Sequence, residues 1–440
     1  MNQDQETLHI IVNPVAGHGQ GPHFVEENVI PILRHLLIPY QIHTTSSPGD
    51  AGNIGQYLTR SFDGGATIRL AIVGGDGTFH ELIEGVQDVT GIKWEVVLLP
   101  FGTANALFSS LFPPSTPLSP SSLDLISSMP FPLSDGIQHQ LSSLFSYLTK
   151  SPSINLPITQ TTLSTKAAIC EKFSSHVVLS TSLHAAILHD SEALRESHPG
   201  TERFKIAAAQ NASKLFYANV NLSSNSQAPS DVEQWDPNSQ EWTRPFTISN
   251  SVSTKDDNHK EGSAEWYVKG PFSYFLSTST VDRLEPTFMI SPFTNLKSEG
   301  DQFIYVTMIR PFRDRFIPSS KIEERKDNLS KRAFEIVGSA YNAGSHVDLT
   351  YPASQAVVEG DDSRNGNGLE TKGEGEPVVE VFRCTSFNWN PSIEQKSEGW
   401  EQGNNRLVCA DGALHSIPEG GSAEVELRTQ EKDTGFFVFA

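Results

Sequence analysis

Cysteine is scarce in this sequence, and basic residues are outnumbered by acidic ones. The 440 residues include three cysteines, which lie far apart and form no CxxC pair. This pattern excludes a disulfide-rich scaffold and a cysteine zinc site, and it predicts a reducing, cytoplasmic compartment. Lysine and arginine number 32 against 52 aspartates and glutamates, for a net charge of −20. Phosphate-driven binding of nucleic acid is therefore not expected.

Long apolar runs are lacking as well. No run of 18 apolar residues occurs, the first residues do not resemble a signal peptide, and neither end carries a lipidation signal. We therefore expect a soluble protein whose contact with a membrane surface is at most transient and peripheral. The sequence does not indicate an oligomeric state.

The order of apolar segments predicts two domains. Residues 1–150 alternate strand-like and helical stretches, which is typical of an α/β domain with a parallel sheet. Its strands are expected at 8–12, 40–44, 68–73 and 94–99, with a crossover helix over 25–36 that Pro31 kinks. Residues 160–440 contain mostly short, β-like segments and predict an antiparallel, β-rich domain. Two polar stretches in it, 223–262 and 359–377, are expected to be mobile insertions.

The first predicted strand runs into a glycine-rich loop. Residues 10–21 read IIVNPVAGHGQG, with glycines at 17, 19 and 21. Glycine lets the backbone approach a phosphate closely, and the following helix would present its N-terminus to the anion. The spacing matches neither a Walker loop nor the dinucleotide fingerprint GxGxxG. An ordinary strand–turn–helix loop is the alternative.

The second loop carries a stronger signal. Residues 71–86 read AIVGGDGTFHELIEGV, in which a buried strand enters GGDGT and then a helix. Thr78 could cap the helix or bind phosphate, and Asp76 could orient Mg²⁺ or accept a hydroxyl proton. The alternative for Asp76 is a turn or N-cap acid.

A third loop follows the strand at 94–99. Residues 96–111 read VVLLPFGTANALFSSL, with a turn at 100–103 and a helix from about Asn105. The carboxyl ends of parallel strands face one crevice, so the three loops should converge there. The sequence therefore predicts a cleft for nucleotide phosphates.

Taken together, these segments resemble the catalytic domain of the diacylglycerol kinase superfamily, and the sphingosine and ceramide kinases most of all. The similar stretches are NPVAGHGQG, VIPILRHLLIPYQIHTT, GGDGTFHELIEGV, LPFGTANALFSSL, DSEALR and VCADG. The resemblance implies a Rossmann-like α/β domain that binds ATP and Mg²⁺, and a C-terminal antiparallel β-sandwich that binds lipid. It also implies ATP-dependent phosphorylation of a lipid hydroxyl.

The resemblance also implies roles for individual residues. Asp76 would be the general base and Mg²⁺ ligand, with Glu81 nearby. Arg195 and Arg203 would be cationic phosphate contacts; surface arginines paired with Glu192 or Glu196 are the alternative. The remaining nucleotide contacts would be Asn13, Gly17, Gly19, Gly21, Thr44 or Thr45, Gly75, Gly77, Thr78, Gly102, Thr103, Asn105 and Asp411.

The sequence departs from the sphingosine and ceramide kinases in two places. Ala186 and Leu188 stand where that group carries acids near the substrate headgroup, and Ala413 replaces the glutamate of a closing Asp-Gly-Glu. The expected acceptor is a sphingoid base, ceramide or diacylglycerol. A pseudokinase that binds nucleotide or lipid without transfer is the alternative. NAD kinase also uses GGDG, but its Asn-Glu pair is absent from the sequence.

Overall fold

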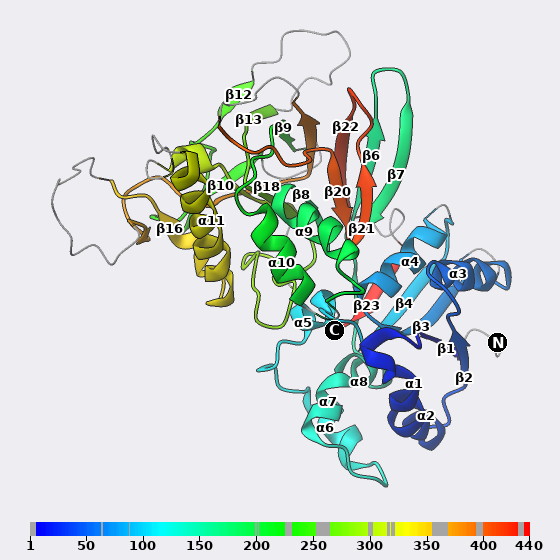
Figure 1. The fold of residues 1–440 in the computed structure, drawn as a ribbon. Helices are drawn as coiled ribbons and strands as arrows, with labels where there is room; N and C mark the ends of the chain where they lie inside the picture. Colours follow the sequence, from blue (N-terminus) through cyan, green and yellow to red (C-terminus); the bar gives the residue numbers. More distant parts are fainter. Residues whose placement is uncertain are drawn as a thin grey trace.

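The computed structural model describes residues 6–62, 65–87, 89–198, 200, 202–224, 231–251, 265–297, 302–314, 317, 322–353, 368–392, 399–429 and 435–440. An α/β unit at the N-terminal end lies beside two antiparallel sheets (Figure 1). Both parts of the predicted fold class are therefore confirmed.

A parallel sheet organises the N-terminal part of the chain. The four predicted strands are confirmed as β1 (Leu8–Val12), β2 (Tyr40–Thr44), β3 (Thr67–Gly74) and β4 (Lys93–Pro100), in the order β2-β1-β3-β4. Strand β1 and the C-terminal parts of β3 and β4 are apolar on consecutive positions because helices cover both faces, whereas β2 lies at the edge of the sheet and is partly exposed. Helices α3 (Asp50–Arg60) and α4 (Asp76–Val86) pack on one face. Helices α1 (Gly21–Phe24), α2 (Ile30–His35) and α8 (Ser142–Leu148) pack on the other.

The first crossover helix is irregular where the sequence predicts a kink. A π-helical turn, η3 (Val25–Val29), separates α1 from α2 and closes with the amide of Ile30 bonded to the carbonyl of Val25. Pro31 follows directly. Because proline has no amide hydrogen to bond in the helical ladder, the chain makes its irregular turn at this point.

The parallel sheet is completed by strands from outside the expected range. Strand β23 (Phe436–Phe439) lies parallel to β4, and β5 (Ser153–Asn155) pairs antiparallel with β23. Phe436 and Val438 are buried in the core with Trp94. Residues 436–439, expected in the second domain, therefore belong to the first sheet, and so do residues 153–155, which lie between the two predicted domains. Their apolar side chains complete the core of this sheet.

The rest of the chain forms a sandwich of two antiparallel sheets. The first has the order β11 (Glu241–Thr243), β10 (Glu233–Asp236), β18 (Glu380–Cys384), β15 (Ile304–Ile309), β14 (Tyr274–Thr278), β8 (Val178–Thr181), β20 (Leu407–Ala410) and β21 (Ala413–Ser416). The second has the order β12 (Ser249–Ser251), β13 (Glu265–Lys269), β9 (Ala218–Ser223), β19 (Ser386–Pro391), β22 (Ser422–Arg428), β6 (Ile158–Ser164) and β7 (Ile169–Ser175). A core that includes Phe275, Phe382 and Trp389 draws on strands of both sheets.

The expectation of mobile insertions is wrong for the part that the structure describes. Within 223–262, strands β10, β11 and β12 extend the edges of the two sheets, because Trp235 and Trp242 pack together and Gln234 is fully buried. Within 359–377, β17 (Glu370–Thr371) pairs with β16 (Leu349–Thr350). Residues 225–230, 252–264 and 354–367 lie outside the described residues.

Several helices complete the molecule. Helices α5 (Ala106–Leu111), α6 (Pro120–Ser127) and α7 (Asp135–Gln140) follow β4, and three more interrupt the β-rich part: α9 (Ser182–Ala193), α10 (Glu202–Asn211) and α11 (Ile322–Gly338). The prediction of mostly β structure beyond residue 164 does not include these three helices. Over the described part of the chain, no helix combines the length and the apolar character needed to cross a bilayer.

Candidate active site

Two of the predicted glycine loops touch each other through their backbones. A Cβ atom placed on Gly75 would lie 2.7 Å from the Cα of Gly102, and one placed on Gly102 would lie 2.3 Å from the Cα of Gly75. Any side chain at either position would force the loops apart. These two positions therefore require glycine so that the β3–α4 and β4–α5 loops can meet.

The first glycine loop joins the other two. The side-chain amide of Asn13 donates to Oγ1 of Thr78 over 3.0 Å. Gly17 has a φ of +58°, and a Cβ atom there would lie 2.9 Å from the carbonyl oxygen of Phe101. The three loops thus converge at one edge of the parallel sheet, as their positions after β1, β3 and β4 predict.

Asp76 connects the second loop to the third. Its Oδ2 accepts a hydrogen bond from the amide of Ala106 at 2.8 Å, and its Oδ1 accepts one from the amide of Leu107 at 3.1 Å. Asp76 therefore holds the N-terminus of α5. Burial raises the pKa of Asp76, while the charge of His176 and the two amide bonds counteract part of that rise.

Other predicted contacts lie around the same edge. Thr45 follows β2, is buried, and donates its amide to the carbonyl of Val12 over 2.9 Å. The side chain of Asn105 accepts from the amide of Gly102 at 2.7 Å and donates to its carbonyl at 3.0 Å. Asn105 therefore fixes the shape of the third loop, in which Thr103 is exposed.

Glu81 does not share the position of Asp76. Five helical residues separate the two, which corresponds to about 140° around the helix axis. The carbonyl oxygen of Glu81 lies where α4 packs on α3, 2.7 Å from the position of a Cβ on Gly52. The structure therefore does not bring Glu81 to Asp76, and its catalytic role stays a prediction.

The two predicted phosphate-binding arginines have different surroundings. Arg195 is exposed and forms two hydrogen bonds with Glu192, at 2.9 and 2.7 Å. That geometry is the surface pairing that the sequence left open as the alternative. Arg203 lies on α10 with its guanidinium 4.6 Å from the ring centre of Phe204, and its buried Nε has no hydrogen-bond partner.

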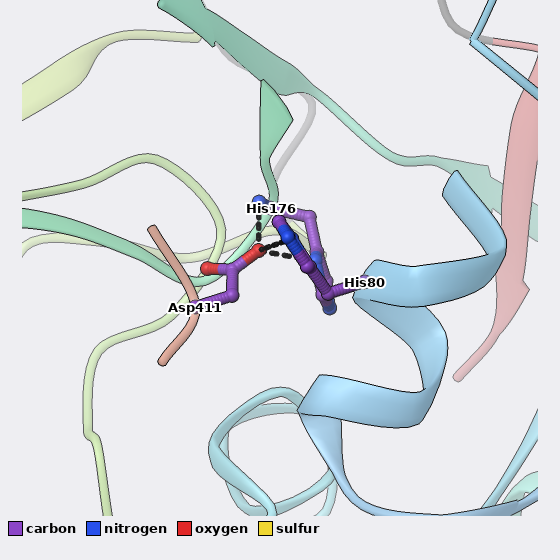
Figure 2. A group of neighbouring side chains, drawn as sticks. All are labelled: His80, His176 and Asp411. Carbon is purple, nitrogen blue, oxygen red and sulfur yellow. Dashed lines mark hydrogen bonds and ion pairs between the residues drawn. The ribbon is translucent and has the colours of Figure 1, made fainter. Parts of the chain in front are cut away.

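Asp411 lies in the turn between β20 and β21, where its carboxylate is fully buried. It accepts hydrogen bonds from the amides of His176, Val177 and Val178 at 2.8 to 2.9 Å. Its Oδ2 also lies 3.1 Å from Nδ1 of His80 (Figure 2). The contacts of Asp411 therefore join the connection between β7 and β8 to α4. The nucleotide contact that the resemblance implies for Asp411 stays a prediction.

Two histidines flank this carboxylate, as Figure 2 shows. Nδ1 of His176 lies 2.7 Å from Oδ2 of Asp411, although neither ring nitrogen of His176 has a partner in hydrogen-bond geometry. Burial alone would raise the pKa of Asp411, but the charges of His176 and His80 lower it well below its ordinary range. Burial lowers the pKa of His80, but the bond to Asp411 and the negative charges of Asp411, Glu84 and Glu81 together raise it. The buried carboxylate is therefore ionised.

The donor atoms of His80, His176 and Asp411 lie within 4.8 Å of one another, and their types would suit a metal ion. However, the oxygens of Asp411 already accept three backbone amides, so we interpret the group as buried ion pairing. Sequence reasoning missed both histidines. His80 could have been noticed, because a residue four positions after Asp76 lies on the same side of the helix.

The segment expected near the substrate headgroup forms α9. Ala186 is buried, and His184 bonds through Nδ1 to Oγ of Ser180 at 2.7 Å. Burial lowers the pKa of His184 to about 4, so its imidazole is neutral at pH 7. Asp190 accepts hydrogen bonds from Asn211 at 2.7 Å and from His189 at 2.8 Å. No free carboxylate is therefore found at these positions of α9.

Comparison with known proteins assigns the N-terminal part of the chain. Residues 7–128 match the diacylglycerol kinase catalytic domain, and this segment contains all three glycine loops. Human sphingosine kinase 1 is 29% identical over 106 residues, which are 23% of this chain and 27% of that protein. Sphingoid long chain base kinase 4 of Schizosaccharomyces pombe is 29% identical over 102 residues, which are 22% of this chain and 21% of that protein. Residues 7–128 are therefore similar to the diacylglycerol kinase catalytic domain.

The chain spans about a quarter of the length of these two curated relatives. A crystal structure of a diacylglycerol kinase from Bacillus anthracis strain Sterne aligns with 99% of this chain and 96% of its own, with a TM-score of 0.46 and 12% identity.

Proposed function

We propose that the protein is an ATP-dependent lipid kinase, which transfers the γ-phosphoryl group of ATP to a lipid hydroxyl. The observation that supports this most directly is the position of Asp76. Two α5 amides fix its carboxylate beside the point where Gly75 and Gly102 meet. A phosphate bound there would lie against backbone amides at the N-terminus of α4, next to a carboxylate that can accept the hydroxyl proton.

Each part of the cleft then has a chemical task. The N-terminal amides and dipole of α4 hold the phosphates of ATP, and the glycine loops exclude side chains from the backbone that contacts them. Asp76 accepts the proton of the lipid hydroxyl as its oxygen attacks the γ-phosphorus. Each Asp76 oxygen keeps a lone pair after its amide bond, so the residue also fits as an oxygen ligand of Mg²⁺. Bound Mg²⁺ would neutralise charge on the transferring phosphoryl group.

The acceptor that we propose is a lipid with a neutral headgroup, such as ceramide or diacylglycerol, in preference to sphingosine. The two named relatives act on sphingosine and sphingoid bases. Here Ala186 and Leu188 provide no carboxylate for a protonated amine, His184 is neutral, and Asp190 is bound to Asn211. Access to such lipids implies transient contact with a membrane surface by a cytoplasmic protein.

A transfer assay with Mg²⁺, γ-labelled ATP and mixed micelles of ceramide, diacylglycerol or sphingosine tests this proposal. We expect labelled ceramide or diacylglycerol, and a weaker signal with sphingosine. A strong preference for sphingosine would contradict the headgroup assignment. The second candidate is a pseudokinase, favoured by Ala186, Leu188 and Ala413. It requires ATP binding without transfer to any of the three lipids.

A further inference from the structure

Helix α4 belongs to the phosphate-binding cleft at its N-terminus and to the domain interface along its side. It begins at Asp76, in the second glycine loop. Four residues further, His80 reaches Asp411 of the sandwich domain at 3.1 Å. Four residues beyond that, Oε1 of Glu84 accepts the amide of Ser174 from β7 at 2.6 Å. His80 and Glu84 lie one helical turn apart on one face, so this face of α4 docks on the second domain.

The bond between His80 and Asp411 is the buried part of this interface. The side chain of Asp411 is 0% exposed and that of His80 is 9% exposed. An ionised carboxylate accepts, so Nδ1 of His80 carries the hydrogen and donates. The backbone amides of residues 176–178 fix Asp411 rigidly within the sandwich. His80 therefore connects α4 to a point that cannot shift without breaking those amide bonds.

An aromatic contact reinforces the same docking. Phe79, next to His80 on α4, packs edge-on against the ring of His176 with 4.8 Å between centroids. Phe79 also lines the small cleft beside Gly75 and Asp76. A change in the angle between α4 and the sandwich would therefore alter how the sandwich faces the cleft.

Resting on the proposed function, we propose that His80 is a positioning residue for phosphoryl transfer. By donating to Asp411, it fixes the lipid-binding sandwich against the helix that begins at the phosphate loop. It thereby sets the distance between the acceptor hydroxyl and the phosphoryl group held beside Asp76. The nucleotide loops lie wholly within the first domain, so His80 controls transfer and leaves nucleotide binding unaffected.

Two substitutions of His80 separate positioning from simple loss of stability. His80→Leu removes the donor and keeps the bulk, whereas His80→Asn retains an amide donor near the place of Nδ1. The matched control is His346→Leu, in which a buried histidine loses a bond to the carbonyl of Ile290 at 3.1 Å, both residues belonging to the β-rich part of the chain. For each protein, kcat, the lipid KM, the Kd of a non-hydrolysable ATP analogue and Tm are measured.

We expect His80→Leu to lower kcat about tenfold, with the Kd of the ATP analogue within twofold of the parent. His80→Asn should recover most of the lost kcat, and His346→Leu should lower Tm without lowering kcat. An unchanged kcat in His80→Leu would overturn the proposal. A second contradicting outcome is that kcat and nucleotide binding both fall in His80→Leu by the fraction of protein that is unfolded. A third is that the parent binds one equivalent of a metal ion and His80→Leu binds none.

Hydrogen exchange at the amide of Ser174 tests the docking independently of activity. This amide bonds to Glu84 across the interface, one turn of α4 away from His80. We expect it to exchange faster in His80→Leu than in the parent and in His346→Leu. If the parent transfers no phosphate, the proposed function fails while this readout still tests the docking. Equal exchange rates in parent and His80→Leu would overturn the inference.

Discussion

At the residue scale, Asp76 makes two hydrogen bonds to the amides of α5 and is the residue that we propose as the proton acceptor. We predict that Asp76→Asn lowers the rate of phosphoryl transfer by about 10² to 10⁴, because the proton acceptor is lost. The asparagine amide would also face one of the two α5 amide donors and lose that bond, at a cost of about 1 kcal/mol in the free energy of unfolding. Transfer from γ-labelled ATP and a denaturant titration measure both effects.

The matched control for that substitution is Asp236→Asn. Asp236 also caps backbone and side-chain donors, since it accepts the amide of Asn238 at 3.0 Å and the hydroxyl of Ser239 at 2.8 Å. It is the last residue of β10, at the hairpin to β11 and outside the three glycine loops, so its substitution should leave transfer unchanged. Equal turnover in Asp76→Asn and the parent would remove Asp76 from the mechanism.

The sequence predicts the position of a residue whose motif fixes its local structure, but it does not predict the partner of a residue that could pair with several groups. GGDGT predicts that Asp76 lies between a strand and a helix, and the structure has it at the start of α4, because glycine, aspartate and helix start are adjacent in the chain. Arg195 could pair with a phosphate or with Glu192, and only the fold shows the pairing with Glu192. The cluster around Asp411 joins residues 331 positions apart, from His80 to Asp411. No local pattern encodes such a contact.

At the scale of elements, the hairpin of β10 and β11 shows why a mostly polar segment can form ordered strands. The ring of Trp235 packs on those of Trp242 and Phe293, with 5.6 and 4.5 Å between centroids. We predict that Trp235→Ala costs about 2 kcal/mol or more in the free energy of unfolding, since a large aromatic contact is lost. Phe246→Ala, at a side chain of 49% exposure, should stay within about 0.5 kcal/mol. Thermal melts that show no difference between the two would contradict the packing role.

The strands of the parallel sheet were more predictable than the helices of the second domain. A strand buried on both faces leaves a continuous apolar run, as in β1, which matches its predicted range residue for residue. The edge strand β2 is partly exposed and also matches its predicted range. In helices α9 and α10 the apolar residues recur with little helical periodicity, so neither segment shows a distinct apolar face in the sequence. Strand β23 is short, and 335 residues separate it in the sequence from β4, its partner in the sheet. Such a long-range pairing has no signal in the chain around it.

At the scale of the whole molecule, β23 makes the first domain depend on residues from the far end of the sequence. Phe436 is 3% exposed and stacks on Trp94 with 5.8 Å between centroids. We predict that Phe436→Ala costs about 3 to 5 kcal/mol and weakens binding of an ATP analogue, because Phe436 also contacts Phe79 on α4. Leu37→Ala, at 87% exposure, is the control. Unchanged binding and Tm in Phe436→Ala would contradict this dependence.

Buried histidines make the free energy of unfolding depend on pH, and His80 acts in the opposite direction to His184 and His346. Burial lowers the pKa of His184 and of His346 to about 4 from an ordinary 6.5. In both cases the unfolded chain binds more protons between those values, so stability is lost as pH falls below 6.5. His80 has a raised pKa, so its contribution is complete below 6.5 and is lost as pH rises through the folded value.

We therefore predict that the stability gap between the parent and His80→Leu depends on pH. The gap should be largest below pH 6.5, where His80 is protonated beside the ionised Asp411 and near the charges of Glu81 and Glu84. It should narrow as pH rises and the imidazole becomes neutral, because a neutral donor bonds a carboxylate less strongly than a charged one. Urea titrations at pH 5.5, 7 and 8.5 measure the gap directly. The stability gap between the parent and His346→Leu should instead widen as pH rises, because burial favours the neutral form of His346. A gap for His80→Leu that stays constant across the three pH values would show that folding does not raise the pKa of His80.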